Sequence, residues 1–214
     1  MKITGPEGSI QPQKGKHGLS YHPEFKVWLK EHPHAMSQVA GLIEKIIDHN
    51  PQNAGYELSE GNVRVVFIRA TFSHLFKVII GENIFFVKRD KARLQMPGVF
   101  PVGGQGEYTD SAIAKEGLKN DPDIEIIDFQ LGYTREDAKH PVAYFVSRWE
   151  ELQTVTGYLS NPNIKPEEKK EIEAKVTKAF RLFQTYHDVS TKNMFYDPRT
   201  KKIKMFDLNE NPNF

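Results

Sequence analysis

Three β-rich segments between residues 62 and 89 constrain the fold of this chain more than any other feature. They read NVRVVFIRA (62–70), HLFKVII (74–80) and IFFVKR (84–89), and β-branched and aromatic residues dominate them. Gly81-Glu82-Asn83 between the last two is a tight-turn signal. Strands joined by such a turn run in opposite directions, so the sequence predicts an antiparallel sheet.

Helical patterns lie on both sides of these strands. Residues 22–31 and 34–49 are predicted as helices, the second with an apolar stripe at helical spacing. After the strands we expect a helix over 111–120, capped by Thr109 or Asp110, then strands over 124–134 and 142–149. Pro166 begins a long amphipathic helix that runs to residue 187. This order predicts an α+β fold with a mainly antiparallel sheet followed by a helical region.

Composition narrows the classes of function. The chain has 214 residues, 29 Lys and Arg against 28 Asp and Glu, and a net charge of +1, so its charge does not favour nucleic acid or an anionic membrane as a partner. There is no cysteine, which excludes disulfides, thiolate zinc sites and a cysteine nucleophile. No apolar run reaches the roughly 18 residues that a membrane span needs. The polar first residues, MKITGPEGSIQPQKGKHG, lack the apolar core of a signal peptide, and we expect residues 1–20 to be a flexible leader.

A cluster of polar residues near the end of the sequence suggests chemistry. Asp188 and Asn193 lie on a loop that leaves the long helix, and MFY and IKMF flank the turn DPRTKK, so they should pair as a hairpin. The hairpin would return Asp207 beside Asn193. Oxygen ligands near a free carboxylate suit Mg²⁺ and a phosphate substrate. Asn193 and Asp207 could hold the metal, and Asp188 could accept a proton from an attacking hydroxyl.

This stretch resembles the catalytic loop of protein kinases and of aminoglycoside-type phosphotransferases. That family has an Asp, four further residues, an Asn, and then a hairpin that ends in a metal-binding Asp. The resemblance implies that Asp188 is the catalytic Asp, that Asn193 and Asp207 bind Mg²⁺, and that Lys192 is a cation near the transferred phosphoryl group.

The three β-rich segments resemble the first strands of a kinase small lobe. The resemblance implies that ATFSH (70–74), with Ser73 and His74, takes the phosphate-loop position. It makes Lys88 in FFVK the phosphate-binding lysine and Glu116 its partner on the following helix. YFVSRWEEL would then be the last small-lobe strand and the hinge. The sequence departs from the pattern of this family in two places. Residues 70–74 contain no glycine, and the motif that begins with the metal-binding Asp207 reads Asp-Leu-Asn, without the usual glycine.

The resemblance implies a minimal protein-kinase-like fold, similar to short bacterial effector kinases. The expected parts are the leader (1–20), an N-terminal helical segment (21–60), an antiparallel small lobe (61–150) and a reduced large lobe (151–214).

The expected activity is ATP- and Mg²⁺-dependent phosphoryl transfer to a hydroxyl of an acceptor protein. The alternatives are a kinase of a small hydroxylated molecule and a pseudokinase-type module that holds a protein partner, which the missing glycines favour. A cytoplasmic location fits the sequence, and the polar leader is also compatible with a secreted effector.

Overall fold

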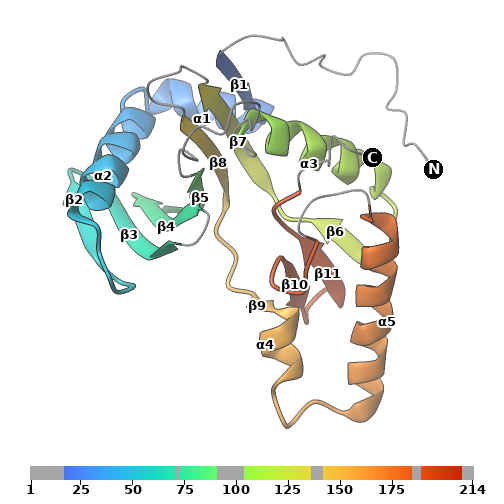
Figure 1. Cartoon of the computed structure of the whole chain (residues 1–214). Helices are drawn as coiled ribbons and strands as arrows, with labels where there is room; N and C mark the ends of the chain where they lie inside the picture. The colour runs from blue at the N-terminus through green and yellow to red at the C-terminus, as the bar shows by residue number, and fades with distance from the viewer. Residues whose placement is uncertain (1–16, 71–72, 91–103, 136–141, 185–188, 209–214) are drawn as a thin grey trace, which may run out of the picture. The chain divides into compact units, whose positions relative to one another are not determined.

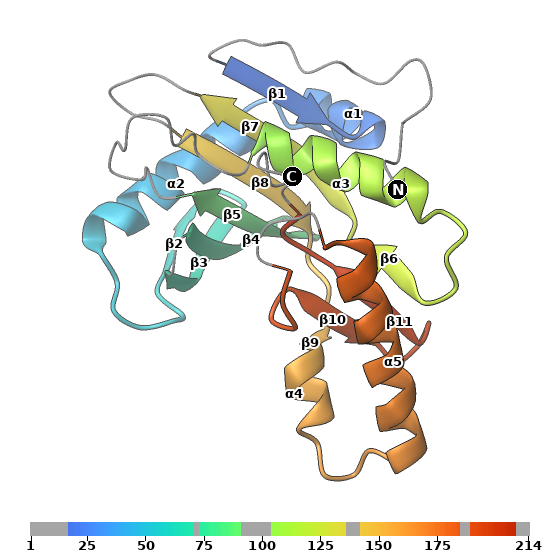
Figure 2. The same cartoon turned by 45° about the vertical axis from the view of Figure 1, so that its right-hand side comes forward.

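The computed structural model describes residues 17–70, 73–90, 104–135, 142–184 and 189–208 (Figures 1 and 2). The chain divides into two compact units, and neither is continuous in sequence. The large-sheet unit consists of the described parts of Pro12–Tyr108 and Asp128–Trp149. The small-sheet unit consists of the described parts of Thr109–Ile127 and Glu150–Phe214. Each is described by itself below.

The large-sheet unit is built on a seven-stranded antiparallel sheet with the order β1-β7-β8-β5-β4-β3-β2. Its strands are β1 (His17–Tyr21), β2 (Glu57–Glu60), β3 (Val63–Ala70), β4 (Ser73–Ile80), β5 (Asn83–Asp90), β7 (Phe129–Arg135) and β8 (Val142–Arg148). The predicted meander is therefore present as β3-β4-β5, and Gly81, at φ 58°, makes the tight turn between β4 and β5. This confirms the predicted antiparallel sheet and the α+β class.

Helices α1 (Pro23–Glu31) and α2 (Ala35–His49) pack on one face of this sheet. The predicted stripe of α2 supplies Val39, Ile43 and Ile46, which join Phe76 and Val87 of the sheet in one buried cluster. Burial of these side chains is the main stabilising term for the unit. Side chains alternate along β5, so Lys88 lies on the opposite face of the sheet from α1 and α2.

Helix α3 (Gln105–Gly117) begins against that opposite face. Tyr108 packs edge-on against Phe129 of β7, with ring centroids 4.9 Å apart. Gly132 of β7 allows this approach, because a Cβ atom there would lie 2.4 Å from the carbonyl oxygen of Gly104 and 2.5 Å from Cβ of Tyr108. The first turn of α3 therefore depends on a glycine in the neighbouring strand.

The small-sheet unit has four strands in the order β6-β11-β10-β9, with β6 parallel to β11 and the other pairs antiparallel. Its elements are β6 (Ile124–Ile126), β9 (Gln153–Thr154), α4 (Val155–Leu159), α5 (Pro166–Leu182), β10 (Met194–Asp197) and β11 (Lys202–Met205). Ile172, Val176 and Ala179 form the buried face of α5, and the hairpin buries Met194 and Ile203. The predicted amphipathic helix and the predicted hairpin are both present.

Several predicted boundaries are wrong. The stretch 124–134 is not one strand but two, β6 and β7, which belong to different sheets. Helix α3 begins at Gln105 instead of residue 111, and α5 ends at Leu182. Residues 17–20, expected in the leader, belong to β1, which pairs with β7. None of the helices in the described part of the chain is long and apolar enough to cross a membrane.

Candidate functional site

The hairpin of β10 and β11 has Asn193 just before its first strand and Asp207 shortly after its second. Met194 pairs with Met205 in the strand register, and beyond that pair the backbone N–H of Phe206 donates to the carbonyl oxygen of Asn193 at 3.0 Å. Asn193 is therefore directly across from the residue that precedes Asp207. Its own N–H donates to the carbonyl oxygen of Ser190 at 3.0 Å, which fixes the turn before the hairpin.

The backbone of Asp207 is in the left-handed region, at φ 61°. A side chain with a Cβ atom is disfavoured there, although Asp and Asn tolerate it better than most residues. Strained conformations of this kind cluster at active sites and ligand clamps. Asp207 is half-buried, so its carboxylate combines this backbone conformation with partial access to solvent.

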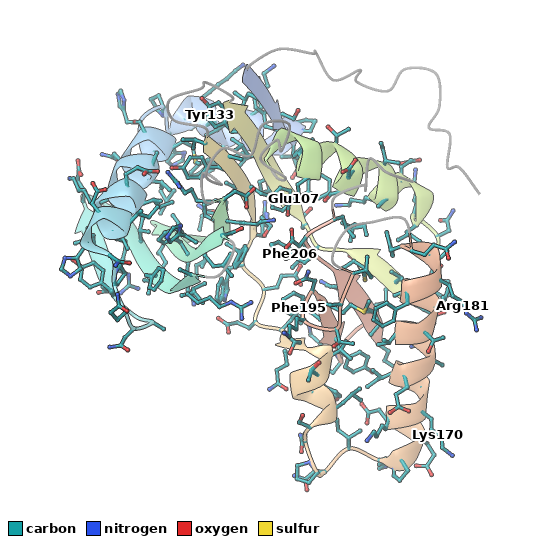
Figure 3. The ribbon with its side chains drawn as sticks, in the orientation of Figure 1. Glu107, Tyr133, Lys170, Arg181, Phe195 and Phe206 are labelled. Carbon is teal, nitrogen blue, oxygen red and sulfur yellow. The ribbon has the colours of Figure 1, made fainter. Side chains whose placement is uncertain are left out.

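Two phenylalanines lie beside this pair. Phe195 and Phe206 are half-buried, and their rings meet edge-to-face with centroids 6.5 Å apart (Figure 3). They belong to the same face of the small sheet, because Phe195 pairs with Lys204, two residues before Phe206. This contact holds the two strands together next to Asn193 and Asp207.

The structure describes one of the two remaining residues of the predicted catalytic loop, Lys192, and does not describe the other, Asp188. Asp188 lies outside the described residues. Lys192 is exposed in the turn that precedes β10. Lys88 belongs to the large-sheet unit, whereas Lys192, Asn193 and Asp207 belong to the small-sheet unit.

The donor atoms of Asn193 and Asp207 fit Mg²⁺ in type. Mg²⁺ is commonly held by one or two carboxylate or amide oxygens, with water and substrate phosphates completing its octahedral shell. Among the described residues no group of three His, Cys, Asp or Glu side chains could hold a metal ion by itself. A hairpin with one amide and one carboxylate therefore suits a metal that arrives with a phosphate ligand better than a resident structural metal.

In the large-sheet unit, Lys88 forms a buried ion pair with Glu107 of α3. Lys88 Nζ donates to Glu107 Oε2 at 2.9 Å. Lys88 is 5% exposed and Glu107 is completely buried, so the pair is removed from water. In the protein interior an ionic contact is far stronger than at the surface. Desolvation of the two charges is costly, and the pair lies on the face of the sheet opposite α1 and α2.

The predicted partner of Lys88 was Glu116, and that prediction is wrong. Glu116 is exposed, and its carboxylate lies 3.8 Å from Lys119, in the turn that follows α3. Glu107 and Glu116 are nine residues apart, about two and a half turns, so they project from opposite sides of α3. The error came from the predicted start of the helix, which left Glu107 in the preceding loop.

Ser73 and His74 are strand residues and not loop residues. They are the first residues of β4 and pair with Asp90 and Arg89 of β5. The hydroxyl of Ser73 donates to Asp90 Oδ1 at 2.6 Å in a buried contact. His74 is half-buried, and its ring stacks near Phe76. Residues 71 and 72 of the predicted phosphate loop lie outside the described residues. In the described part of that loop, Ser73 is hydrogen-bonded to the Asp90 carboxylate.

A second ion pair fixes β5 from the other face of the sheet. Arg89, the neighbour of Lys88, makes two hydrogen bonds of 3.0 Å to the carboxylate of Glu44 on α2. Tyr144 of β8 donates to the same carboxylate at 2.8 Å. Burial, and then the nearby Glu44 carboxylate, raises the pKa of Tyr144 well above its ordinary value, so it stays a neutral donor. This arrangement clamps the strand that carries Lys88 to α2.

Buried charges also support the hairpin in the small-sheet unit. Asp197 of β10 accepts hydrogen bonds from Arg199, at 3.0 Å from Nε, and lies 3.5 Å from Lys204 Nζ. Hydrogen bonding from Arg199 lowers the pKa of Asp197 to about 2, against the opposing effect of burial. Burial alone would lower the pKa of Lys204, but its hydrogen bond to Glu150 outweighs this and raises it.

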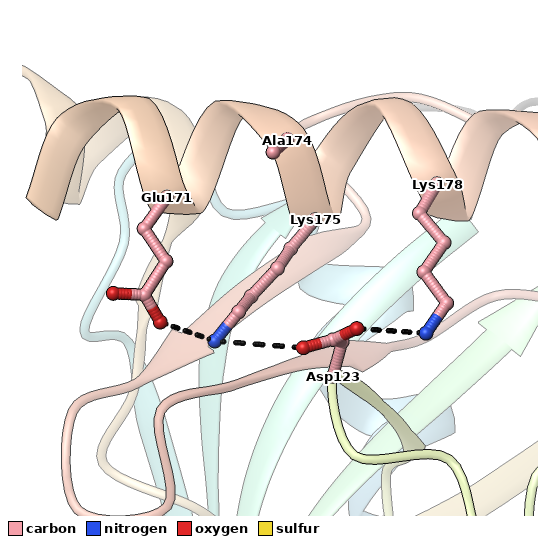
Figure 4. Close-up of a pocket in the computed structure, with 5 residues that line it drawn as sticks. All are labelled: Asp123, Glu171, Ala174, Lys175 and Lys178. Atoms are coloured by element: carbon pink, nitrogen blue, oxygen red, sulfur yellow. Dashed lines mark hydrogen bonds and ion pairs between the residues drawn. The ribbon is translucent and has the colours of Figure 1, made fainter.

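An open depression on the small-sheet unit is lined by Asp123, Glu171, Ala174, Lys175 and Lys178 (Figure 4). Lys178 lies 2.7 Å from Asp123 and 2.8 Å from Asp121, and Lys175 lies 2.7 Å from Glu171. The charges of its lining residues are therefore already paired with one another. This network fastens α5 to the segment before β6 and is a structural feature.

No protein-family model matches the chain, and no curated protein matches it.

Proposed function

We propose that the protein is an ATP- and Mg²⁺-dependent phosphotransferase with a minimal protein-kinase-like fold. The observation that carries the proposal is the buried Lys88–Glu107 pair, with the lysine on β5, the last strand of the β2-β3-β4-β5 meander, and the glutamate on the helix that follows. Protein kinases carry their phosphate-binding lysine on the third strand and pair it with a glutamate of the next helix. The large-sheet unit would thus correspond to the small lobe, and the small-sheet unit to a reduced large lobe.

The hairpin supplies independent support. In kinases the catalytic-loop Asn and an Asp that follows a hairpin hold the metal ions. Asn193 directly precedes the β10–β11 hairpin, and its carbonyl oxygen accepts a hydrogen bond from Phe206, the residue before Asp207. The backbone of Asp207 is in the left-handed region, at φ 61°. Each unit of the chain therefore contains one half of the expected motif.

In this proposal each residue has one task. Lys88, oriented by Glu107, would contact the phosphates of ATP, and Asn193 and Asp207 would hold Mg²⁺. Asp188 would orient the acceptor hydroxyl and accept its proton, and Lys192 would place a positive charge near the transferred group. The metal would neutralise phosphate charge when bound. Catalysis of this kind depends mainly on positioning and charge stabilisation.

The favoured acceptor is a hydroxyl of a protein, and a small hydroxylated molecule is the alternative within the same chemistry. A pseudokinase-type binding module is the second candidate. It is favoured by the buried Ser73–Asp90 contact and by the absence of glycine from residues 70–74, because glycines let the backbone approach the phosphates closely. The Asn193–Asp207 pair favours the enzyme, since a module that only holds a protein needs no metal ligands.

Calorimetric titration with ATP and Mg²⁺ and a radiolabel transfer assay on a cell lysate test the proposal. We expect saturable binding and a discrete labelled product. Lys88→Met should weaken binding and abolish labelling, whereas Lys119→Met on the exposed end of the α3 region should change neither. Binding without transfer would favour the pseudokinase. If the protein binds no ATP with any divalent metal ion, the proposed kinase is refuted, and so is an ATP-binding pseudokinase.

A further inference from the structure

Lys88 has a second buried carboxylate beside it. Asp90 follows Lys88 by two residues on β5, so both side chains lie on the same face of the sheet. Asp90 Oδ1 is 3.9 Å from Lys88 Nζ. Asp90 is 7% exposed and Ser73, its partner across the strands, is 8% exposed. The Lys88 ammonium therefore lies near two carboxylates, those of Glu107 and Asp90, in a site that largely excludes water.

The two carboxylates are not equivalent. Glu107 accepts a hydrogen bond from Lys88 at 2.9 Å, whereas 3.9 Å is too long for one. The oxygen of Asp90 that faces Lys88 is also the atom that accepts the 2.6 Å hydrogen bond from Ser73. Ser73 thus holds the Asp90 carboxylate at a distance where it acts on the ammonium through charge and not through a hydrogen bond.

A phosphate group that approaches Lys88 must come near this second carboxylate. Like charges a few ångströms apart at a buried position repel each other by an amount that changes a binding constant substantially. Glu107 is oriented by its hydrogen bond from Lys88, which uses one of the three N–H donors of the ammonium. Asp90 has no such geometric role toward Lys88, so its charge opposes the phosphate.

We propose that Asp90 sets the affinity for the nucleotide by competing with its phosphates for the Lys88 ammonium, and that Ser73 moderates this competition by holding the Asp90 carboxylate back. The inference rests on the proposed function and deepens it. Asp90 is an affinity-determining residue and has no part in the chemical step. The arrangement also gives Ser73 a task other than direct phosphate binding.

Two substitutions separate this role from a purely structural one. Asp90→Asn removes the charge but keeps an oxygen that can accept from Ser73, and we expect the Kd for ATP with Mg²⁺ and for inorganic tripolyphosphate to fall roughly tenfold. Ser73→Ala removes the hydrogen bond to the Asp90 oxygen that faces Lys88, so the attraction between this carboxylate and the ammonium should increase and the same Kd values should rise. If both residues served only to stabilise the sheet, both variants would lower thermal stability and weaken binding together.

Glu82→Gln is the matched control, because it removes the same charge from an exposed position in the turn between β4 and β5. Calorimetric titration of the full chain and its three variants gives decisive outcomes. Opposite shifts for Asp90→Asn and Ser73→Ala, with none for Glu82→Gln, support the inference. Binding by Asp90→Asn but not by the parent also supports it.

If the parent binds and Asp90→Asn binds equally or more weakly, the inference is wrong while the proposed function stands. If no form binds ATP or tripolyphosphate, both are wrong. Should Asp90→Asn fail to fold, Ser73→Ala decides alone: unchanged or tighter binding overturns the inference.

Discussion

The ammonium of Lys88 and the carboxylate of Glu107 are 2.9 Å apart and almost completely removed from solvent. A buried ion pair gives modest net stability, but the loss of one partner leaves an uncompensated charge. The main effect of the pair is therefore to fix the position of the Lys88 ammonium, and its net contribution to folding is small.

Glu107→Gln should lower both the stability and the nucleotide affinity of the protein. Loss of the carboxylate leaves Lys88 with weaker compensation, and we expect the free energy of unfolding to fall by about 3 kcal/mol. Urea unfolding and calorimetric titration measure the two effects. Glu116→Gln, on the exposed side of the same helix, should change neither quantity by more than about 0.5 kcal/mol. Equal effects of the two substitutions would contradict the assignment of Glu107.

Gly132→Ala should disturb the first turn of α3. The new methyl group would collide with backbone atoms of Gly104, which cannot move aside as a flexible side chain could. We expect a loss of about 2 kcal/mol in stability and a weaker Lys88–Glu107 contact, because α3 has to shift. Gly41→Ala on α2 is the control, since nothing lies within 4 Å of its added Cβ. It should be neutral or stabilise by up to about 1 kcal/mol.

Substitutions of Asp207 and Asp188 should separate two roles in the proposed reaction. Asp207→Asn keeps a residue that tolerates φ 61° but removes the metal-binding charge, so it should weaken ATP–Mg²⁺ binding and abolish transfer. Asp188→Ala should leave binding nearly intact and lower turnover by about 10² or more, the usual scale for a positioned base. Calorimetry beside a radiolabel assay measures both. Loss of nucleotide binding in Asp188→Ala with retention in Asp207→Asn would reverse the assignments.

The hairpin should lose stability in acid through Asp197. Its pKa in the folded protein is about 2, below the ordinary value of 3.8, so the unfolded chain takes up a proton first as the pH falls. The stabilisation is complete above about pH 5 and disappears between about pH 4 and pH 2, and it is no more than about 2 kcal/mol because Arg199 is largely exposed. Asp197→Asn should flatten the acid unfolding curve over this window. Asp48→Asn, on the exposed end of α2, should leave the curve unchanged.

Lys178→Met should weaken the attachment of α5. The hydrogen bonds to Asp121 and Asp123 raise the pKa of Lys178. Burial alone would raise the pKa of Asp121, but the hydrogen bond from Lys178 and two backbone N–H groups outweigh it and lower the pKa. We expect a loss of about 1 kcal/mol that shrinks at high salt, because the lysine is partly exposed. Lys170→Met, earlier on the same helix and exposed (Figure 3), should show no such dependence on salt.

The local elements could be predicted because their signals are local. Turn residues and alternating apolar side chains are sufficient to predict the hairpin, and its register then places Asn193 opposite Phe206. The meander that carries Lys88 follows from the same kind of pattern. For this reason the sequence alone predicts that the hairpin brings the backbone near Asp207 back to Asn193.

The pairing of Lys88 could not be predicted in the same way. Gly104 and Gly106 near the start of α3 disfavour a helix by intrinsic propensity, yet the helix starts there because Tyr108 packs on Phe129. The split at Ile127 and Asp128 has no glycine or proline to mark it. Strand β1 contains Gly18 and Ser20 and has little β propensity, so its pairing with β7 is a tertiary effect. The Glu107 position could have been found by testing both faces of a longer helix against the lysine.

The parallel pairing of β6 with β11 has a consequence for synthesis on the ribosome. Every strand of the large sheet has left the ribosome soon after Arg148 has been made, so that sheet can close early. Ile124–Ile126 must wait for Lys202–Met205 before it gains its neighbour. During that interval an apolar strand has no partner and is exposed to chaperones and to wrong pairing. Slow codons between the two segments should therefore affect the yield of folded protein more than slow codons within β3-β4-β5, whose contacts are close in sequence.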